Sequence, residues 1–245
     1  LGANTTGAAN TAVGATALDA NTTANYNVGI GYAALGATTT GADNTAVGSG
    51  ALEGNTTASN NTAVGRAALQ SNTTGAGNVA IGRQAMDANT TGAEAVGIGE
   101  NALGANTTGD YNVAIGENAL GANTTASNNV AVGRRALLAN TTGAGNVAIG
   151  TAALDAGNGN HNVAVGEDAL TANTAADNVA VGRKAMESNT SGTANTGIGR
   201  AALAANTTAN NNTAVGYLAL TANTTGHSNT AMGKNAGIAV TTGTE

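Results

Sequence analysis

The residue types that most often carry catalysis are scarce in this sequence and stand apart from one another. The chain has two histidines, His161 and His227, and no cysteine. Neither histidine has companion ligands at metal-binding spacing, and neither has a nearby serine or aspartate in catalytic order. We therefore predict no metal site and no nucleophilic catalysis.

Two glycine pairs look like the phosphate-binding turn of dinucleotide-binding proteins. They are Gly29 with Gly31, and Gly97 with Gly99. Such a turn opens a helix whose N-terminus binds the phosphates. No helical pattern follows either pair, and both pairs belong to a repeat that covers the chain. The sequence thus predicts no cofactor, no catalytic residue and no enzymatic activity.

A third candidate chemistry is glycosylation of asparagine in the pattern Asn-x-Thr. In a eukaryotic secretory pathway this pattern predicts a row of glycans on one loop of the repeat. The acceptor residues would be Asn4, Asn21, Asn55, Asn72, Asn89, Asn106, Asn123, Asn140, Asn206 and Asn223.

These residues are positioned by a 17-residue repeat, Asn-[Thr/Val]-Ala-[Val/Ile]-Gly-x-x-Ala-[Leu/Met]-x-x-Asn-Thr-Thr-[Gly/Ala]-x-x, whose positions we number from the first asparagine. The glycine at position 5 marks fourteen copies. It is Gly14, Gly31, Gly48, Gly65, Gly82, Gly99, Gly116, Gly133, Gly150, Gly166, Gly182, Gly199, Gly216 and Gly233. The spacing is 17 residues except on both sides of Gly166, where it is 16. The two deletions fall in the loop and not in the strand.

The repeat predicts an all-β fold. It alternates over its first five positions and meets glycine or asparagine every few residues, which indicates strand, turn, short strand and turn. Equivalent strands would stack in parallel about 4.8 Å apart. We expect a parallel β-solenoid of about 14 rungs over residues 1–237, followed by a terminal or junction segment over residues 238–245. Because Leu1 falls in the middle of a repeat, we interpret the chain as an excerpt of a longer array.

The columns of the repeat suggest a core and a contact surface. Branched side chains at position 4, such as Val47 and Val64, suit the inner face of a strand, and the leucine at position 9 would close the core from the second strand. Position 3 is always alanine or glycine, which predicts a partner backbone close to that face. This core is thin for one chain, so we expect a homo-oligomer, and specifically a trimer.

Composition excludes several partners. The chain has 37 glycines, no proline, 2% aromatic residues and a net charge of -6 from singly scattered charges. Nucleic acid is not an expected partner, because no basic stripe is present. No apolar run approaches the roughly 18 to 20 residues that cross a bilayer, so no membrane segment is predicted in this stretch.

Polar columns are expected to hold the stack together. Asparagines at positions 1 and 12 would form amide ladders at the corners of the coils. Charges gather after the glycine, where stacking would place Arg83 beside Glu100 and Glu117 beside Arg134.

The Asn-Thr-Thr loops also set threonine files along one edge, which suggests ice binding. Adjacent strand residues face opposite ways, however, so a flat two-column threonine face is not expected.

The segments Asn78 to Gly82, Asn112 to Gly116 and Asn146 to Gly150 read Asn-Val-Ala-Ile-Gly. They resemble the head repeats of YadA-like trimeric autotransporter adhesins, whose Ser-Val-Ala-Ile-Gly phrase marks rungs of a left-handed β-roll built from three chains. The phrase from Asn212 to Leu220 also resembles the repeats of bacterial and phage tail-fibre-domain proteins. The repeat of this chain is longer than the adhesin unit and adds the Asn-Thr-Thr loop. The resemblance implies a trimeric left-handed β-roll.

Two functions are consistent with the sequence. The first is a non-enzymatic structural or adhesive fibre segment at a cell or virion surface, which self-associates into trimers and end-to-end filaments and contacts a host receptor or glycan. The second is a ligand-binding solenoid, either ice-binding or receptor- and glycan-binding, that uses its arrays of threonine and asparagine loops. Both predict an extracellular or surface location.

Overall fold

The computed structural model describes residues 1–243, and these residues are all-β and contain no helix. The chain divides into two units, Leu1–Ser127 (unit 1) and Asn128–Glu245 (unit 2). The strands of unit 1 are β1 (Thr11–Val13), β2 (Val28–Ile30), β3 (Thr45–Val47), β4 (Thr62–Val64), β5 (Val79–Ile81), β6 (Val96–Ile98) and β7 (Val113–Ile115). The strands of unit 2 are β8 (Val130–Val132), β9 (Val147–Ile149), β10 (Val163–Val165), β11 (Val179–Val181), β12 (Thr196–Ile198), β13 (Thr213–Val215) and β14 (Thr230–Met232).

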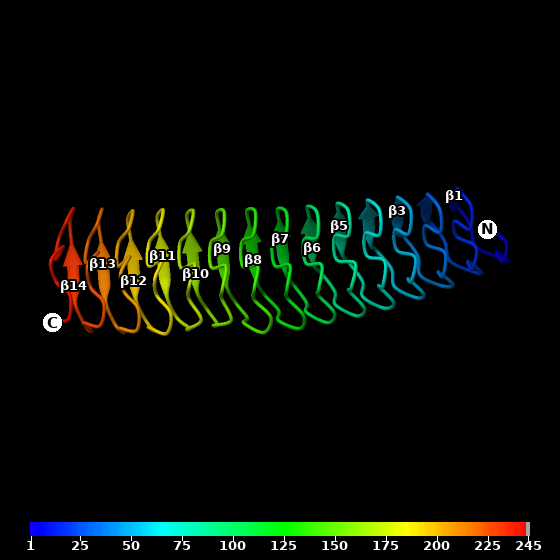
Figure 1. Cartoon of the computed structure of the whole chain (residues 1–245). Coiled ribbons are helices and arrows are strands. Elements are labelled where there is room, and N and C mark those ends of the chain that lie inside the picture. Colours follow the sequence, from blue (N-terminus) through cyan, green and yellow to red (C-terminus); the bar gives the residue numbers. More distant parts are fainter. Residues whose placement is uncertain (244–245) are drawn as a thin grey trace. The chain divides into compact units, whose positions relative to one another are not determined.

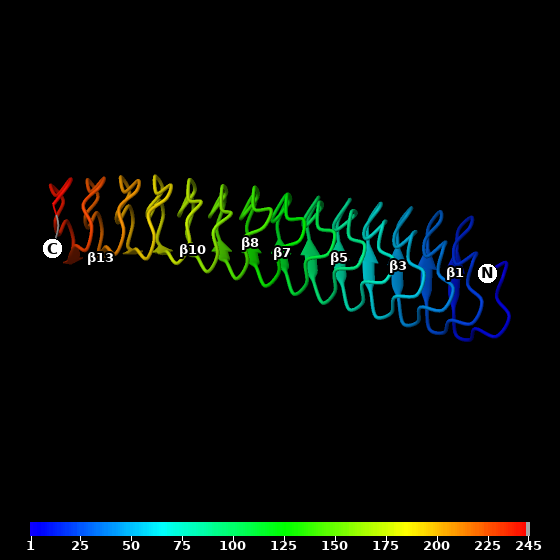
Figure 2. The same ribbon diagram turned by 90° about the horizontal axis from the view of Figure 1, so that it is seen from below.

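Within each unit, every strand pairs in parallel with the strand of the next coil (Figure 1). The register follows the repeat, so Thr62 of β4 lies beside Val79 of β5. Figure 2, the view from below, shows that consecutive coils of a unit follow the same path. Each unit is therefore a parallel β-solenoid, and the predicted fold class is confirmed.

The two shortened coils of unit 2 keep this register. Val147, Val163 and Val179 occupy equivalent places in β9, β10 and β11, although they are 16 residues apart instead of 17. The missing residues are thus taken from the loops, as the sequence predicts.

The segment that contains the leucine of position 9 is a series of turns, and the predicted second strand is wrong. Leu35 and Leu103 have φ angles of 54° and 53°, which belong to the left-handed region and not to a strand. The segment nevertheless bonds from coil to coil as a strand would. The N–H of Leu35 donates to the carbonyl of Ala51 at 3.0 Å. The coil is therefore one strand plus stacked turns.

The core of each coil consists of positions 3, 8 and 9, and the prediction that position 4 forms the core is wrong. Ala63, Ala68 and Leu69 are fully buried. A Cβ added at Gly97 would lie 2.8 Å from Cγ of Met86, so position 3 faces the long side chain of the preceding coil. The coil is so thin that only alanine or glycine fits there. The predicted contact of a partner backbone with position 3 is therefore wrong as well.

Position 5 admits only glycine. Gly65 has a φ of 135°, a region that L-residues rarely adopt, and a Cβ there would lie 2.4 Å from the carbonyl oxygen of Gly82. This glycine ends the strand and starts the turn in every coil.

The two predicted asparagine ladders are present and buried. At position 12, Nδ2 of Asn89 donates to Oδ1 of Asn72 at 2.8 Å and to the carbonyl of Gly92 at 2.9 Å. At position 1, Oδ1 of Asn61 accepts the N–H of Asn78 at 2.9 Å. The ladders satisfy loop groups that the strands leave unpaired.

The predicted terminal segment begins as a continuation of the last coil. Nδ2 of Asn229 donates to the carbonyl of Gly243 at 2.8 Å, which repeats the bond made one coil earlier by Asn212 to Gly226. Residues 244–245, the end of the predicted segment, lie outside the described residues.

Candidate functional site

The outward side of each sheet, which we call the outer face, consists of positions 2 and 4 of the strands. Side chains alternate along a strand, so burial of position 3 turns its two neighbours to the outside. In unit 1, Ile30 and Ile81 are each 38% exposed, and in unit 2 Ile149 is 41% exposed. The outer face is therefore lined by β-branched, mainly apolar side chains.

The outer face is regular in two directions. Side chains two residues apart on one strand are separated by about 7 Å, and equivalent side chains of neighbouring coils by about 4.8 Å. At position 2 the residue is threonine in some coils, such as Thr45 and Thr62, and valine in others, such as Val79 and Val96. Sequence reasoning missed this surface because it assigned position 4 to the core. The signal that could have revealed it is the strict smallness of position 3.

The two threonines of a loop differ in their contacts and, in most coils, in their exposure. Oγ1 of Thr73, the first threonine of its loop, donates to the carbonyl of Thr90 in the next coil at 2.9 Å. Thr74, the second threonine, is exposed. The first hydroxyl thus bonds to the next coil, and the second threonine is exposed at coil spacing.

The predicted glycosylation residues lie in the position 12 ladder. Nine of the ten are fully buried, namely Asn21, Asn55, Asn72, Asn89, Asn106, Asn123, Asn140, Asn206 and Asn223. Nδ2, the atom to which a glycan would be attached, points into the coil and donates to a carbonyl. The folded coil has no room for a glycan at these nine residues. Asn4 in the first coil is exposed.

Ion pairs connect neighbouring coils on the turn side of each unit. Arg83 pairs with Glu100 in unit 1, as predicted. In unit 2, Nε of Arg183 lies 3.1 Å from Oε2 of Glu167. These side chains are about half exposed, so each pair adds at most about 1 kcal/mol. The pairing of Glu117 with Arg134, which belong to different units, stays a prediction.

Two carboxyl groups are partly buried beside the turns. Burial raises the pKa of Asp87, while a hydrogen bond from Gln84 lowers it. Burial also raises the pKa of Asp155, and the charge and hydrogen bond of Arg135, 3.0 Å away, lower it. At both carboxyl groups, the hydrogen bonds and the nearby charge offset only part of the effect of burial, so the net pKa is raised.

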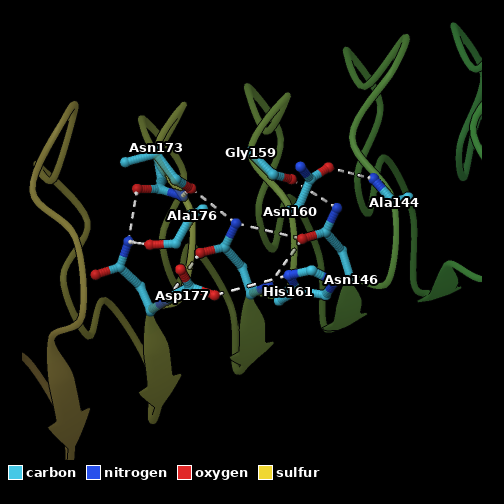
Figure 3. Close-up of polar contacts among 11 residues, drawn as sticks. Ala144, Asn146, Gly159, Asn160, His161, Asn173, Ala176 and Asp177 are labelled. Atoms are coloured by element: carbon cyan, nitrogen blue, oxygen red, sulfur yellow. Dashed lines mark hydrogen bonds and ion pairs between the residues drawn. The ribbon is translucent and has the colours of Figure 1, made fainter.

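The shortened coils of unit 2 place His161 near a carboxylate (Figure 3). Nδ1 of His161 lies 3.7 Å from Oδ1 of Asp177, and the two side chains are 72% and 66% exposed. The surrounding polar groups serve the coil stack. Asn160 accepts the N–H of Ala144 at 2.8 Å, and Asn146 donates to the carbonyl of Gly159 at 2.8 Å. No third side chain among residues 1–243 bonds to this pair, which is an open surface contact.

His227 contacts its own neighbour, with Nδ1 3.4 Å from Oγ of Ser228 on the exposed surface. Across residues 1–243, no group of three or more histidine, cysteine, aspartate or glutamate side chains is arranged to hold a metal ion. The same residues include no helix of the length and apolarity needed to span a membrane.

Comparisons with family models, curated proteins and solved structures find no match to this chain. The surfaces of the coils are therefore the basis for a functional proposal.

Proposed function

We propose that the chain is a non-enzymatic segment of a structural or adhesive fibre at a cell or virion surface, and that copies of it associate through the outer face. The carrying observation is the exposure of a regular, mainly apolar sheet surface. Ile30 and Ile81 in unit 1, and Ile149 and Ile198 in unit 2, are each about two-fifths exposed. Contiguous exposed apolar surfaces of this kind mark sites of association.

The period of the outer face favours a second copy as the partner. A surface with the same coil spacing can interdigitate its position 2 and 4 side chains over many consecutive coils. The side chains of an unrelated globular surface lack this spacing, so they would match the outer face over only a few coils. Closed symmetric assembly hides these faces around an axis, and the resemblance of the repeats to trimeric adhesin heads favours three chains.

The interior supports a structural role. The buried polar side chains are overwhelmingly asparagines, and their amides bond from coil to coil. Such amides support the stack of coils, because most of them bond both to their own loop and to a neighbouring coil. The exposed loops and charges remain for contacts with a host surface or a sibling fibre.

One observation favours the alternative of a ligand-binding solenoid. The second threonine of most loops, such as Thr74 and Thr208, is exposed at coil spacing. A single file of hydroxyls could recognise a repetitive ligand such as a glycan or ordered water, which would place function in the loops and not in the outer face.

The test introduces positive charge on the outer face in one variant and on the threonine loops in another. The double variant Ile81→Arg with Ile149→Arg carries one cation on the outer face of each unit, and Thr74→Arg with Thr208→Arg is the matched loop control. In light scattering coupled to size exclusion, we expect the parent and the control to show a multiple of the 23.2 kDa chain mass. The outer-face variant is expected to be reduced to single chains.

Circular dichroism confirms that both variants retain the parent β-structure. A parent protein that is a monomer at micromolar concentration contradicts the proposal, as does an outer-face variant that assembles normally. Assembly that is lost in the loop variant, or crystal-growth inhibition of ice that is lost only there, supports the alternative.

A further inference from the structure

Unit 1 contains a shallow cavity of about 290 Å³ that none of the surfaces above includes. Tyr32, Asp19 and Glu53 contribute its large side chains, and Gly36 is part of its lining. Its lining residues belong to the turns at positions 6 to 11 of the repeat, and not to the strand positions that form the outer face.

The repeat explains why the cavity exists. Asp19, Gly36 and Glu53 occupy position 10 in three consecutive coils. The glycine in the middle has no side chain, which leaves a gap between the residues Asp19 and Glu53, and Tyr32, at position 6 of that middle coil, also lines the gap. Tyr32 is 63% exposed, so its ring is available to a ligand.

Unit 2 shows what a tyrosine at position 6 contacts when its neighbours are long. Tyr217 occupies the same position, and the guanidinium of Arg200 lies 5.6 Å from its ring centroid. Nζ of Lys234, from the next coil, lies 6.0 Å from the same centroid. Both distances are in the range of cation–π attraction. The coil geometry therefore brings a cation over each side of this ring.

Tyr32 lacks these cations. Its position 6 neighbours are Ala15 and Ser49, which are too short to cover the ring. Among residues 1–243, no basic side chain forms an ion pair with Asp19 or Glu53. Glu53 is held by Gln70, whose Nε2 donates to Oε2 at 2.7 Å. The cavity thus combines an open aromatic ring with two carboxylates that have no cation.

We propose that this cavity binds an organic cation, namely the ammonium or guanidinium end of a basic side chain from a protein partner. The tyrosine ring attracts the cation, and the two carboxylates flank it. The surrounding unit adds a long-range contribution, because unit 1 carries two basic and eight acidic residues.

The spacing disfavours a metal ion. The two acidic residues come from coils two steps apart, a backbone separation of about 10 Å at coil spacing. Calcium requires its oxygen ligands at about 2.3 to 2.6 Å. An extended organic cation spans this gap more readily than a single ion does.

The experiment uses the four tyrosines as reporters. They are Tyr26, Tyr32, Tyr111 and Tyr217, so ring labelling of the full chain yields a small set of NMR signals. The probe is Nα-acetyl-lysine methylamide, and its Nε-acetylated form is the matched neutral probe. We expect saturable shifts of the Tyr32 ring by the cationic probe, with a Kd of about 1 mM. The ring of Tyr217, already covered by two cations, should respond less.

Variants distinguish binding of the probe in the cavity from general electrostatic attraction of the probe to an acidic protein. Tyr32→Ala is expected to weaken binding about 5-fold, which corresponds to a cation–π contact at an exposed site. Asp19→Asn and Glu53→Gln should each weaken it about 3-fold and reduce its salt dependence. Tyr111→Ala removes an equally exposed ring away from the cavity and should leave the affinity unchanged.

Three results would overturn the proposal: equal binding of the neutral probe, no saturation up to about 50 mM, and equal loss of affinity in the Tyr111 variant. Preferential binding of a neutral methyl glycoside would reassign the cavity to carbohydrate. None of these outcomes depends on self-association through the outer face.

Discussion

Unit 1 carries two basic and eight acidic residues, whereas unit 2 carries six of each. The loops differ too. The coils of unit 1 all follow the 17-residue period, while unit 2 contains two coils that are one residue shorter. Yet the strands of both units pair in the same register and bury the same small residues at position 3.

The comparison separates two classes of position in the coil. Positions 1, 3, 5, 8 and 9 build the stack and change little between the units. The charged residues at positions 6, 10 and 17 are exposed or half-buried and carry nearly all of the difference in charge. The coil therefore acts as a constant support on which each unit can present its own surface, and each of the following predictions tests that separation.

The largest effect is expected in the position 12 ladder. Asn89→Ala in unit 1 removes an amide that donates to Asn72 and Gly92 and accepts from Asn106. Buried partners left unpaired cost about 1 to 3 kcal/mol each, so the free energy of unfolding should fall by about 2 to 4 kcal/mol. Denaturant unfolding followed by circular dichroism measures this loss.

Asn173→Ala in unit 2 is the matched variant at a shortened coil. Asn173 donates to Ala175 and accepts from Asn189 and, at 3.4 Å, from Asn178, but the preceding coil has Gly157 in place of the asparagine to which it would donate. The loss should be smaller than for Asn89→Ala. Equal losses would show that the amide link to the preceding coil contributes nothing.

A second pair of variants should give effects of opposite sign. The ladder of unit 1 is interrupted by Thr38, which leaves Oδ1 of Asn21 without a hydrogen bond. Thr38→Asn supplies the missing donor and should stabilise the protein by about 1 kcal/mol. Gly157→Asn, at the equivalent place in unit 2, should destabilise it, because a Cβ there would lie 2.6 Å from Cγ of Leu154.

Thermal unfolding of both variants measures whether each change in stability has the expected direction. Stabilisation by Gly157→Asn would mean that the shortened loop relaxes to accept a side chain. A neutral Thr38→Asn would mean that water already serves Asn21.

The smallest effect concerns the partly buried carboxyl groups of Asp87 and Asp155 and depends on pH. Burial raises the pKa of Asp87 above its unfolded value of 3.8. Protonation thus favours the folded state, and this stabilisation is complete below the unfolded pKa and is lost as pH rises through the folded pKa. Asp87→Asn stays neutral, so relative to the parent it should gain stability as the pH rises above the unfolded pKa of Asp87, by less than about 1 kcal/mol.

Asp155→Asn is the comparison in unit 2. The pKa of Asp155 is also raised by burial, but Arg135 compensates part of that cost and the amide would lose the ion pair. Its gain should be smaller than that of Asp87→Asn. Unfolding curves recorded at several pH values decide the order, and a gain that grows toward acid pH would reverse the assigned sign.

The sequence was sufficient to predict the stacked coils, because each copy of the 17-residue repeat forms one coil of the backbone. The glycine of position 5, for example Gly65, and the asparagines of the ladders indicate where each coil turns. The site of the two deletions also follows from the sequence, since only loops absorb a change in length without a shift of register.

The inside and outside of the strand could not be predicted from side-chain size. Val64 is larger and more branched than Ala63, which suggests a core residue, but the thin coil accepts only the smaller one. Both faces are apolar, so alternation alone does not decide between them. The cavity at Tyr32 was equally hidden, because it depends on which residues stack at positions 6 and 10 of three coils.

The left-handed backbone of the turns has a consequence for how a coil forms. Leu69 and Ala67 both lie in this region, at a cost of roughly 1 to 2 kcal/mol each for a non-glycine residue. The bond from Leu69 to the carbonyl of Ala85 exists only when the next coil is already in place. A finished coil is thus a template for its neighbour, and within each unit folding should resemble the elongation of a filament, slow to nucleate and rapid to extend.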